Sequence, residues 1–177
     1  MDSDATLVDE ARRGEPAAQN RLVSLHHEIA FRVARGIVQD DDLAADAVQD
    51  AFMKAFRSLD RFRGDARFRT WLLSIVVNEA RGTLRSRKRR RESGLDAVGP
   101  VIDPAPAVDD GVVVRAEARR ARALVEDLPE KQRMAVTLRI DEGLSFREIG
   151  ALIGSSEGAA RVNYHHGIRR LREKMSE

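Results

Sequence analysis

Apolar side chains recur at intervals of three and four residues through most of residues 4–91, which is the spacing of one face of an α-helix. In the segment that begins near Pro16, the residues on this face are Leu22, Leu25, Ile29 and Val33. A proline is accepted in the first turn of a helix, where its missing N–H would have no partner in any case. The pattern therefore predicts a long helix that starts near residue 16 and packs this face against a core.

Two further helices are predicted in this half of the chain. The stretch LAADAVQDAFMKAFRSL, residues 43–59, has a wide apolar face and follows three acidic residues, Asp40–Asp42, which favour a helix N-terminus. After the polar loop DRFRGDAR comes a third helical stretch, FRTWLLSIVVNEARGTLRSRKRRR. Its core-facing residues are expected to be Phe68, Trp71, Leu72, Ile75, Val76 and Leu84. Together these segments predict an N-terminal helical bundle over residues 1–91.

Residues 92–114 interrupt the helical pattern. This stretch begins ESGLDAVGPVIDPAPAVDDGV and holds three of the five prolines of the chain. It is longer than an ordinary loop between packed helices. We therefore expect an acidic, flexible linker between two domains.

Helical spacing returns in residues 115–177. The expected boundaries are Pro129 and Gly143 for a first helix, Ser145 with Glu148 as a capping box for a second, Gly154 for a tight turn, and Ser156 as the cap of the last helix. A short helix, a glycine-containing turn and a longer basic helix form a helix-turn-helix pattern. The predicted fold class is all-α: an N-terminal helical bundle and a C-terminal helix-turn-helix bundle joined by the linker.

The last helix places a pair of adjacent histidines, His165 and His166, outside its apolar stripe. That stripe consists of Ala160, Tyr164, Ile168 and Leu171. The residues left to solvent or to a ligand are Arg161, Val162, Asn163, His165, His166 and Arg169. Such side chains could read base edges in a major groove, and the alternative is a solvated face of a bundle. Gly167 weakens an isolated helix by about 1 kcal/mol relative to alanine, which the packing of Ile168 and Leu171 would offset.

Neither metal binding nor catalysis suits the histidine pair. Neighbouring helix positions point about 100° apart, so both imidazoles cannot hold one ion from the same face. No nucleophile elbow or carboxylate dyad accompanies them. We therefore expect no metal, no cofactor and no enzymatic activity.

The composition of the 177-residue chain fits a helical protein: 42% of residues are hydrophobic, 5% aromatic and 34% charged. The absence of cysteine excludes disulfides and fits a reducing cytoplasm. The longest apolar stretch, 71–77, is too short to cross a bilayer, and the acidic N-terminus does not resemble a secretion signal. A cytoplasmic protein without membrane insertion is expected.

Charge is divided into blocks although the net charge is only +2. Residues 39–50 carry five acids and no base, whereas residues 57–91 carry 12 bases and three acids. Residues 92–114 again hold five acids and no base. Blocks of alternating sign predict several different partners along one chain. The acidic helix could dock on a basic protein surface, or its acids could form a solvated face.

The basic blocks favour nucleic acid. Residues 81–91 could bind phosphates through counterion release, although a solvated helix end that complements the helix dipole is the alternative. The loop 61–67 combines cations with the nearby aromatic residues Phe62, Phe68 and Trp71, a mixture that suits unstacked bases of a single strand. Phe68 and Trp71 could instead be core residues, because aromatic side chains bury a large apolar area.

Taken together, these segments resemble the extracytoplasmic-function (ECF) sigma factors of bacterial RNA polymerase. The first segment that carries the resemblance contains an acidic DAVQDAF helix, then FRGD, then FRTWLLSIVVN, similar to the second conserved region of the family. The second contains LPEKQR, GLSFREI and SEG, similar to the fourth region. One departure is ARVNYHHG after SEG, where family members commonly carry a run rich in arginine, lysine and serine.

The resemblance implies three sets of binding residues. Those expected to bind core polymerase are Asp46, Gln49, Asp50 and Met53. Those expected to open the −10 promoter element and hold its non-template strand are Arg61, Arg63, Asp65, Arg67, Phe68, Trp71, Asn78, Arg81 and Arg85. Those expected at the duplex −35 element are Ser145, Arg147, Arg161, Val162, Asn163, His165, His166 and Arg169.

By the same resemblance, residues 1–91 would form the domain for core and −10 binding, residues 92–114 the linker through polymerase, and residues 115–177 the domain for −35 binding. The expected partners are core RNA polymerase, promoter DNA and an anti-sigma factor. One alternative is a free-standing helix-turn-helix regulator, which does not account for the acidic helix and the basic loop. A DNA-processing enzyme would need clustered carboxylates or a positioned nucleophile, and the one tyrosine, Tyr164, falls on the apolar stripe.

Overall fold

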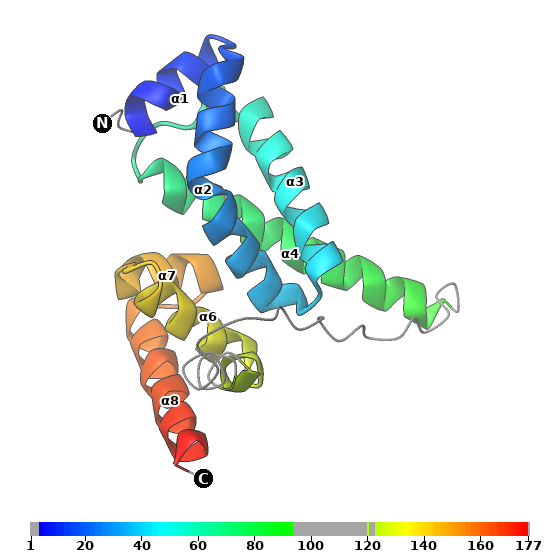
Figure 1. Cartoon of the computed structure of the whole chain (residues 1–177), viewed down its shortest axis with the longest axis vertical. Helices are drawn as coiled ribbons and strands as arrows, with labels where there is room; N and C mark the ends of the chain where they lie inside the picture. Colours follow the sequence, from blue (N-terminus) through cyan, green and yellow to red (C-terminus); the bar gives the residue numbers. More distant parts are fainter. Residues whose placement is uncertain (1–3, 94–119, 121–122, 177) are drawn as a thin grey trace, which may run out of the picture.

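The computed structural model describes residues 4–93, 120 and 123–176. In these residues the regular elements are helices, which confirms the predicted all-α fold. The N-terminal helices are α1 (Asp4–Arg12), α2 (Pro16–Val38), α3 (Asp41–Arg57), the short 3-10 turn η1 (Leu59–Arg61) and α4 (Phe68–Glu92) (Figure 1). The C-terminal helices are α6 (Glu130–Ile140), α7 (Phe146–Ile153) and α8 (Glu157–Met175).

Local signals place the boundary between α2 and α3. Gln39 ends α2 in the left-handed conformation, with φ of 54°, and its N–H donates to the carbonyl of Arg35 over 2.8 Å. The Asp40 carboxylate then accepts the N–H of Leu43 at 3.1 Å and caps α3. Capping of this kind contributes about 1 kcal/mol to helix stability. As predicted, α2 begins at Pro16, in its first turn.

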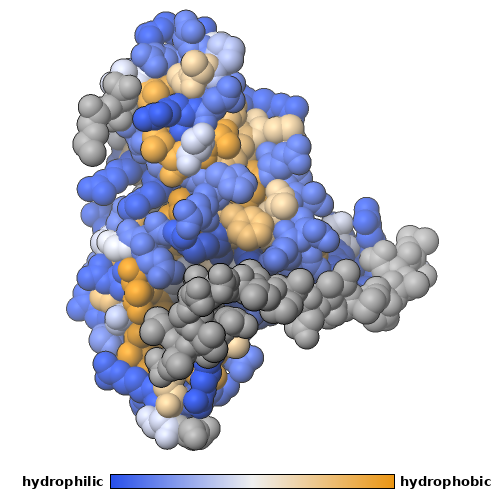
Figure 2. Space-filling view, in the orientation of Figure 1, coloured by the Kyte–Doolittle hydropathy of each residue, from blue (hydrophilic) through white to orange (hydrophobic). Residues whose placement is uncertain are grey.

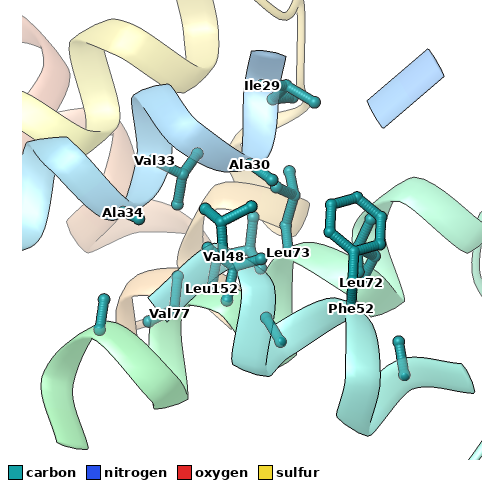
Figure 3. Close-up of a cluster of buried hydrophobic side chains, with 14 of the residues drawn as sticks. Ile29, Ala30, Val33, Ala34, Val48, Phe52, Leu72, Leu73, Val77 and Leu152 are labelled. Atoms are coloured by element: carbon teal, nitrogen blue, oxygen red, sulfur yellow. The ribbon is translucent and has the colours of Figure 1, made fainter. Parts of the chain in front are cut away.

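The core of the N-terminal helices lies between α2, α3 and α4, each of which packs against the other two. Figure 3 shows part of this core, in which side chains from the three helices interdigitate. The labelled members from these helices are Ile29, Ala30, Val33, Ala34, Val48, Phe52, Leu72, Leu73 and Val77. Small residues such as Ala30 and Ala34, with no exposed surface, allow the helix axes to approach closely.

The prediction is wrong for one core residue of α2. Leu25 is 51% exposed, whereas the next residue, His26, is only 7% exposed. The ring of His26 lies 5.4 Å from that of Phe68, measured between centroids. Helix α2 is covered by α1 as well as by α3 and α4. At this turn its buried face therefore includes His26, one position after the residue that the apolar spacing suggested.

The C-terminal helices pack around a close approach between α6 and α8. Gly167 is buried, and a Cβ atom there would lie 2.7 Å from Cγ2 of Val136. Gly167 was predicted to weaken α8, with the packing of neighbouring residues as compensation. In the structure its small size instead allows the close contact between α6 and α8. Of the predicted apolar stripe, Ala160 is fully buried, whereas Tyr164, Ile168 and Leu171 are half-buried.

The two groups of helices share one continuous core. α6 packs against α2, and α7 against α4. Leu152 of α7, 4% exposed, lies among the side chains of α2, α3 and α4 in Figure 3. Helix α4 ends at Glu92, one residue into the segment predicted as linker. Apart from Glu92 and Ser93, that predicted linker lies outside the described residues.

Candidate polymerase and nucleic-acid interfaces

The four residues predicted to bind core polymerase form one exposed stripe on α3. Asp46, Gln49 and Asp50 are exposed, and Met53 is 42% exposed. Their spacing of three and four residues places them on the same face of the helix. The opposite face of α3 carries the buried residues Ala44, Ala47, Val48, Ala51, Phe52 and Ala55. The stripe therefore presents two carboxylates, an amide and an apolar side chain to a partner, without disturbing the core.

The basic loop, residues 61–67, runs from the last residue of η1 to the start of α4. Its polar residues Arg61, Arg63, Asp65 and Arg67 are all exposed, and Arg63 and Asp65 approach each other at 3.9 Å. Gly64 has φ of +79°, a left-handed conformation that glycine adopts without strain. The loop therefore exposes three guanidinium groups within seven residues, suited to the phosphates of a nucleic acid strand.

Three aromatic rings pack beneath this loop. The ring centroid of Phe62 lies 5.9 Å from that of Phe68 and 5.0 Å from that of Trp71. Phe68 is only 2% exposed, so it is a core residue in this structure, the second of the two roles predicted for it, and its ring is not open to a strand here. Trp71 is half-buried. The rings support the loop, and Phe62 and Trp71 remain the aromatic surfaces that a base could reach.

A residue that the sequence reasoning missed fixes the loop from outside. Arg12, at the end of α1, donates from Nε to the carbonyl of Leu59 over 3.2 Å and from Nη2 to the carbonyl of Phe62. Its guanidinium also lies 5.9 Å from the centre of the Phe62 ring. No local pattern signals this role, because the partners lie almost 50 residues further along the chain.

The predicted −10 contacts on α4 differ in availability. Asn78 and Arg85 are exposed. Arg81 is half-buried and forms an ion pair with Glu130 of α6, 3.0 Å apart. Beyond these residues the basic end of α4 runs clear of α2 and α3 (Figure 1), and Lys88 to Arg91 are exposed. One predicted DNA contact is thus occupied by the C-terminal helices.

The helix-turn-helix of α7 and α8 follows the predicted capping. The Ser145 hydroxyl accepts the N–H of Glu148 at 3.3 Å, and the Glu148 carboxylate accepts the Ser145 N–H at 2.9 Å. The hydrogen bond from the Ser145 backbone, despite partial desolvation, lowers the pKa of Glu148 from its usual value. Gly154 forms the turn with φ of +66°, and the Ser156 hydroxyl accepts the N–H of Ala159 at 3.1 Å to cap α8.

The predicted −35 residues lie on two helices. Ser145, which caps α7, is bonded to Glu148, and Arg147 of α7 is exposed. On α8, Arg161, Val162, His165, His166 and Arg169 are exposed. Asn163 is half-buried and donates from Nδ2 to the carbonyl of Ala159 over 2.8 Å, so this predicted reader is held by its own helix.

Polar contacts join the two groups of helices along a seam. Glu142, in the turn between α6 and α7, pairs with Arg32 of α2 and lies 3.8 Å from Arg69 of α4. Glu148 of α7 accepts the hydroxyl of Thr70 at 3.1 Å. A cleft of about 230 Å³ opens beside the seam, lined by Asp4, Leu25, His26, Glu28, Ile29, Arg32, Arg69 and Glu142.

Neither a cluster of metal ligands nor a membrane-spanning helix is found in the described part of the chain. No group of three or more histidine, aspartate or glutamate side chains in it could hold a metal ion. Among its helices, none combines the length and hydrophobicity needed to span a bilayer. Hydrophilic side chains cover most of the face shown in Figure 2, and apolar atoms show through in narrow areas.

Comparison with known proteins defines the class of this architecture. Residues 22–90 match the family described as Sigma-70 region 2, and residues 118–171 match Sigma-70, region 4. The fold is therefore that of a sigma factor of the sigma-70 type. The family follows from whole-chain relatives: the chain is 37% identical over 168 residues to the ECF RNA polymerase sigma-E factor of Escherichia coli K12, covering 90% of this chain and 87% of the relative. This chain belongs to the ECF sigma factors of RNA polymerase.

Further relatives agree. The RNA polymerase sigma-H factor of Pseudomonas aeruginosa is 33% identical over 175 residues, which covers 91% of this chain and 88% of the relative. Among solved structures, CnrH in complex with the cytosolic domain of CnrY has a TM-score of 0.70 and 25% identity, and the match covers 99% of this chain and 98% of CnrH. RpoE of Bartonella quintana, in complex with the anti-sigma factor NepR, has the same fold, with a TM-score of 0.70 at 24% identity, covering 89% of this chain and 96% of that chain. The alternative of a free-standing regulator is not supported.

Proposed function

We propose that α3 docks this sigma factor on core RNA polymerase, that the basic loop and α4 open the −10 element, and that α8 reads the −35 element. The observation that carries the proposal is the acidic stripe of α3 in the same bundle as the basic surface of the loop and α4. A basic protein surface and a DNA strand can therefore be bound by different sides of one small domain.

The basic loop and α4 suit a melted strand better than a duplex. Exposed arginines of the loop attract phosphates, while Phe62 and Trp71 offer apolar ring surface against which an unpaired base can stack. Selection of the −10 sequence would then occur through a base flipped into a pocket formed by the loop. Asn78 and Arg85 extend the contact along α4.

The α8 helix suits a duplex. Its exposed N-terminal half follows directly on the helix-turn-helix corner, and an α-helix fits the major groove of B-DNA. Arg147, on α7, and Arg169, further along α8, are both exposed and would contact phosphates.

The separation of the two promoter elements is larger than the compact structure with its closed seam can span. Twenty-five base pairs between the −10 and −35 positions span roughly 85 Å at 3.4 Å per base pair. A compact fold of this length has a radius of gyration of about 16 Å. The seam that holds α7 against α4 must therefore open before both elements are bound, and core polymerase is the partner that would hold the two halves apart.

The domain boundaries 1–91, 92–114 and 115–177 are part of this proposal, with the middle segment passing through polymerase. The protein would act in the cytoplasm, without catalysing a reaction itself. An anti-sigma factor would control it, as the family resemblance implies. CnrH, which shares the fold at 25% identity, binds the cytosolic domain of CnrY, and a comparable partner would stabilise the closed seam here.

The decisive test is run-off transcription with core enzyme on a library of genomic promoter fragments. The wild-type protein should bind core and start transcription at a defined subset of promoters. Asp50→Lys should weaken core binding while leaving the folded state and the −35 surface intact. The matched control is Glu15→Lys, which reverses an exposed charge before α2 and should leave core binding unchanged.

Two outcomes would contradict the proposal in different ways. Unchanged core binding by Asp50→Lys would reject α3 as the docking surface. A wild-type protein that fails to bind core polymerase at all would reject the whole assignment of partners.

A further inference from the structure

The exposed N-terminal half of α8 offers fewer side chains for base contacts than its sequence suggests. Arg161 lies 3.2 Å from the carboxylate of Glu157, and its guanidinium stacks 5.2 Å from the centre of the Phe146 ring. Asn163 donates to the carbonyl of Ala159. Arg161 and Asn163, which could form the most hydrogen bonds to bases, therefore already contact other groups of the C-terminal helices.

Val162 and His166 remain available on one side of α8. Both are exposed, and neither forms an ion pair or a side-chain hydrogen bond with a described residue. Val162 is 52% exposed and is one of five exposed large apolar side chains in the described part of the chain. Its spacing of four residues from His166 places the two side chains one above the other on the helix surface.

Valine is a stiff side chain in a helix, because its branched Cβ strongly prefers one rotamer. The two methyl groups of Val162 are therefore held in a fixed position on the surface. In the major groove only thymine presents a methyl group, and apolar side chains recognise it by direct contact. An imidazole N–H, by contrast, can donate to the N7 acceptor that both purines present there.

Assuming the proposed role of α8 at the −35 element, we propose that Val162 selects a thymine through its C5 methyl and that His166 selects a purine through N7. Four residues of helix span about 6 Å, and base pairs rise by 3.4 Å. The thymine and the purine therefore lie one or two base pairs apart. This pair of contacts replaces the arginine-rich readout that the rest of the family pattern favours, and it predicts a −35 sequence particular to this chain.

The test uses holoenzyme assembled from the full chain and core polymerase. Duplexes randomised across the −35 region are first selected by binding, and the thymines of the selected sequence are then replaced one at a time by uracil. Uracil lacks only the methyl group, so one replacement should weaken wild-type binding about fourfold, as expected for one buried methyl. The Val162→Ala holoenzyme should bind the thymine and uracil duplexes equally.

A second arm tests the purine. Replacement of the selected purine by its 7-deaza analogue removes N7 and should weaken the wild-type complex but not the His166→Ala complex. The matched control is Met175→Ala, which truncates a side chain that is 54% exposed at the far end of α8 and should retain the full response to uracil.

The possible failures are distinguishable. A selected −35 sequence with no response to uracil, or a response that persists in Val162→Ala, would overturn the thymine assignment and leave the proposed function standing. A full chain that binds core and starts transcription but selects no −35 sequence would overturn both the thymine assignment and the role of α8.

Discussion

The guanidinium of Arg133, on α6, donates a hydrogen bond over 2.6 Å to the carbonyl oxygen of Gly36, on α2. The same group donates to the carbonyls of Glu126 and Leu128, at 2.5 and 2.9 Å. Gly36 lies in the last turn of α2, where carbonyls lack helical partners and the helix dipole is negative. Burial lowers the pKa of Arg133 from its usual value, yet three carbonyls surround its charge. One buried cation thus joins the two groups of helices.

Arg133→Ala should destabilise the protein by about 3 kcal/mol, because it leaves buried carbonyl groups without a donor. Urea unfolding followed by far-ultraviolet circular dichroism would measure the free energy of unfolding. Lys131→Ala, at an exposed position of the same helix, should change this free energy by less than about 0.5 kcal/mol. Equal effects of the two substitutions would show that the buried hydrogen bonds are not a source of stability.

Gly167→Ala should destabilise the C-terminal helices although alanine is the better helix former. The new Cβ would lie 2.7 Å from Cγ2 of Val136, a distance that forces α6 and α8 apart. Overpacking of this kind costs about 1–3 kcal/mol, more than the gain of about 1 kcal/mol in helix propensity. Thermal unfolding would show a lower midpoint for the variant.

Two companion variants isolate the steric cause. Gly158→Ala, on the same helix, places its Cβ no closer than 4.0 Å to another residue and should stabilise the protein. Val136→Ala removes the clashing methyl, so it should reduce the cost of Gly167→Ala in a double-mutant cycle. Additive effects of the two substitutions would contradict the proposed contact.

The sequence predicted the features that depend on neighbours within a few residues. The Asp40 cap, the capping box of Ser145 with Glu148 and the Gly154 turn are local, so their residue types and spacing were sufficient. The bond between Arg133 and Gly36 joins positions 97 residues apart and leaves no local signal. The exposed face of α3 and the burial of Phe68 could be predicted from helical spacing, whereas the hydrogen bond from Asn163 to its own helix depends on a side-chain rotamer and could not.

Acid should weaken the start of α7 through Glu148. Its pKa in the folded protein is lowered, first by the backbone hydrogen bond from Ser145. The ionised carboxylate therefore contributes stability above the pKa of about 4.3 that an unfolded glutamate has, and this contribution is lost as the pH falls through the lowered folded pKa. Between pH 6 and pH 3, the unfolding free energy should decline more steeply for the wild type than for Glu148→Gln. Parallel declines would exclude this carboxylate as a source of the acid sensitivity.

Glu142→Gln should open the seam between the two groups of helices. The Glu142 carboxylate, only 10% exposed, pairs with Arg32 and Arg69, and a neutral amide would leave both cations without this counter-charge.

The chain has no cysteine, so Ala45→Cys on α3 and Arg172→Cys on α8 would provide unique sites for a fluorescent donor and acceptor. Energy transfer between them should fall in Glu142→Gln. The control Glu173→Gln alters an exposed ion pair on α8, and energy transfer should not change in that variant. An unchanged distance distribution in Glu142→Gln would mean that apolar packing around Leu152, rather than the ion pairs, keeps the seam closed.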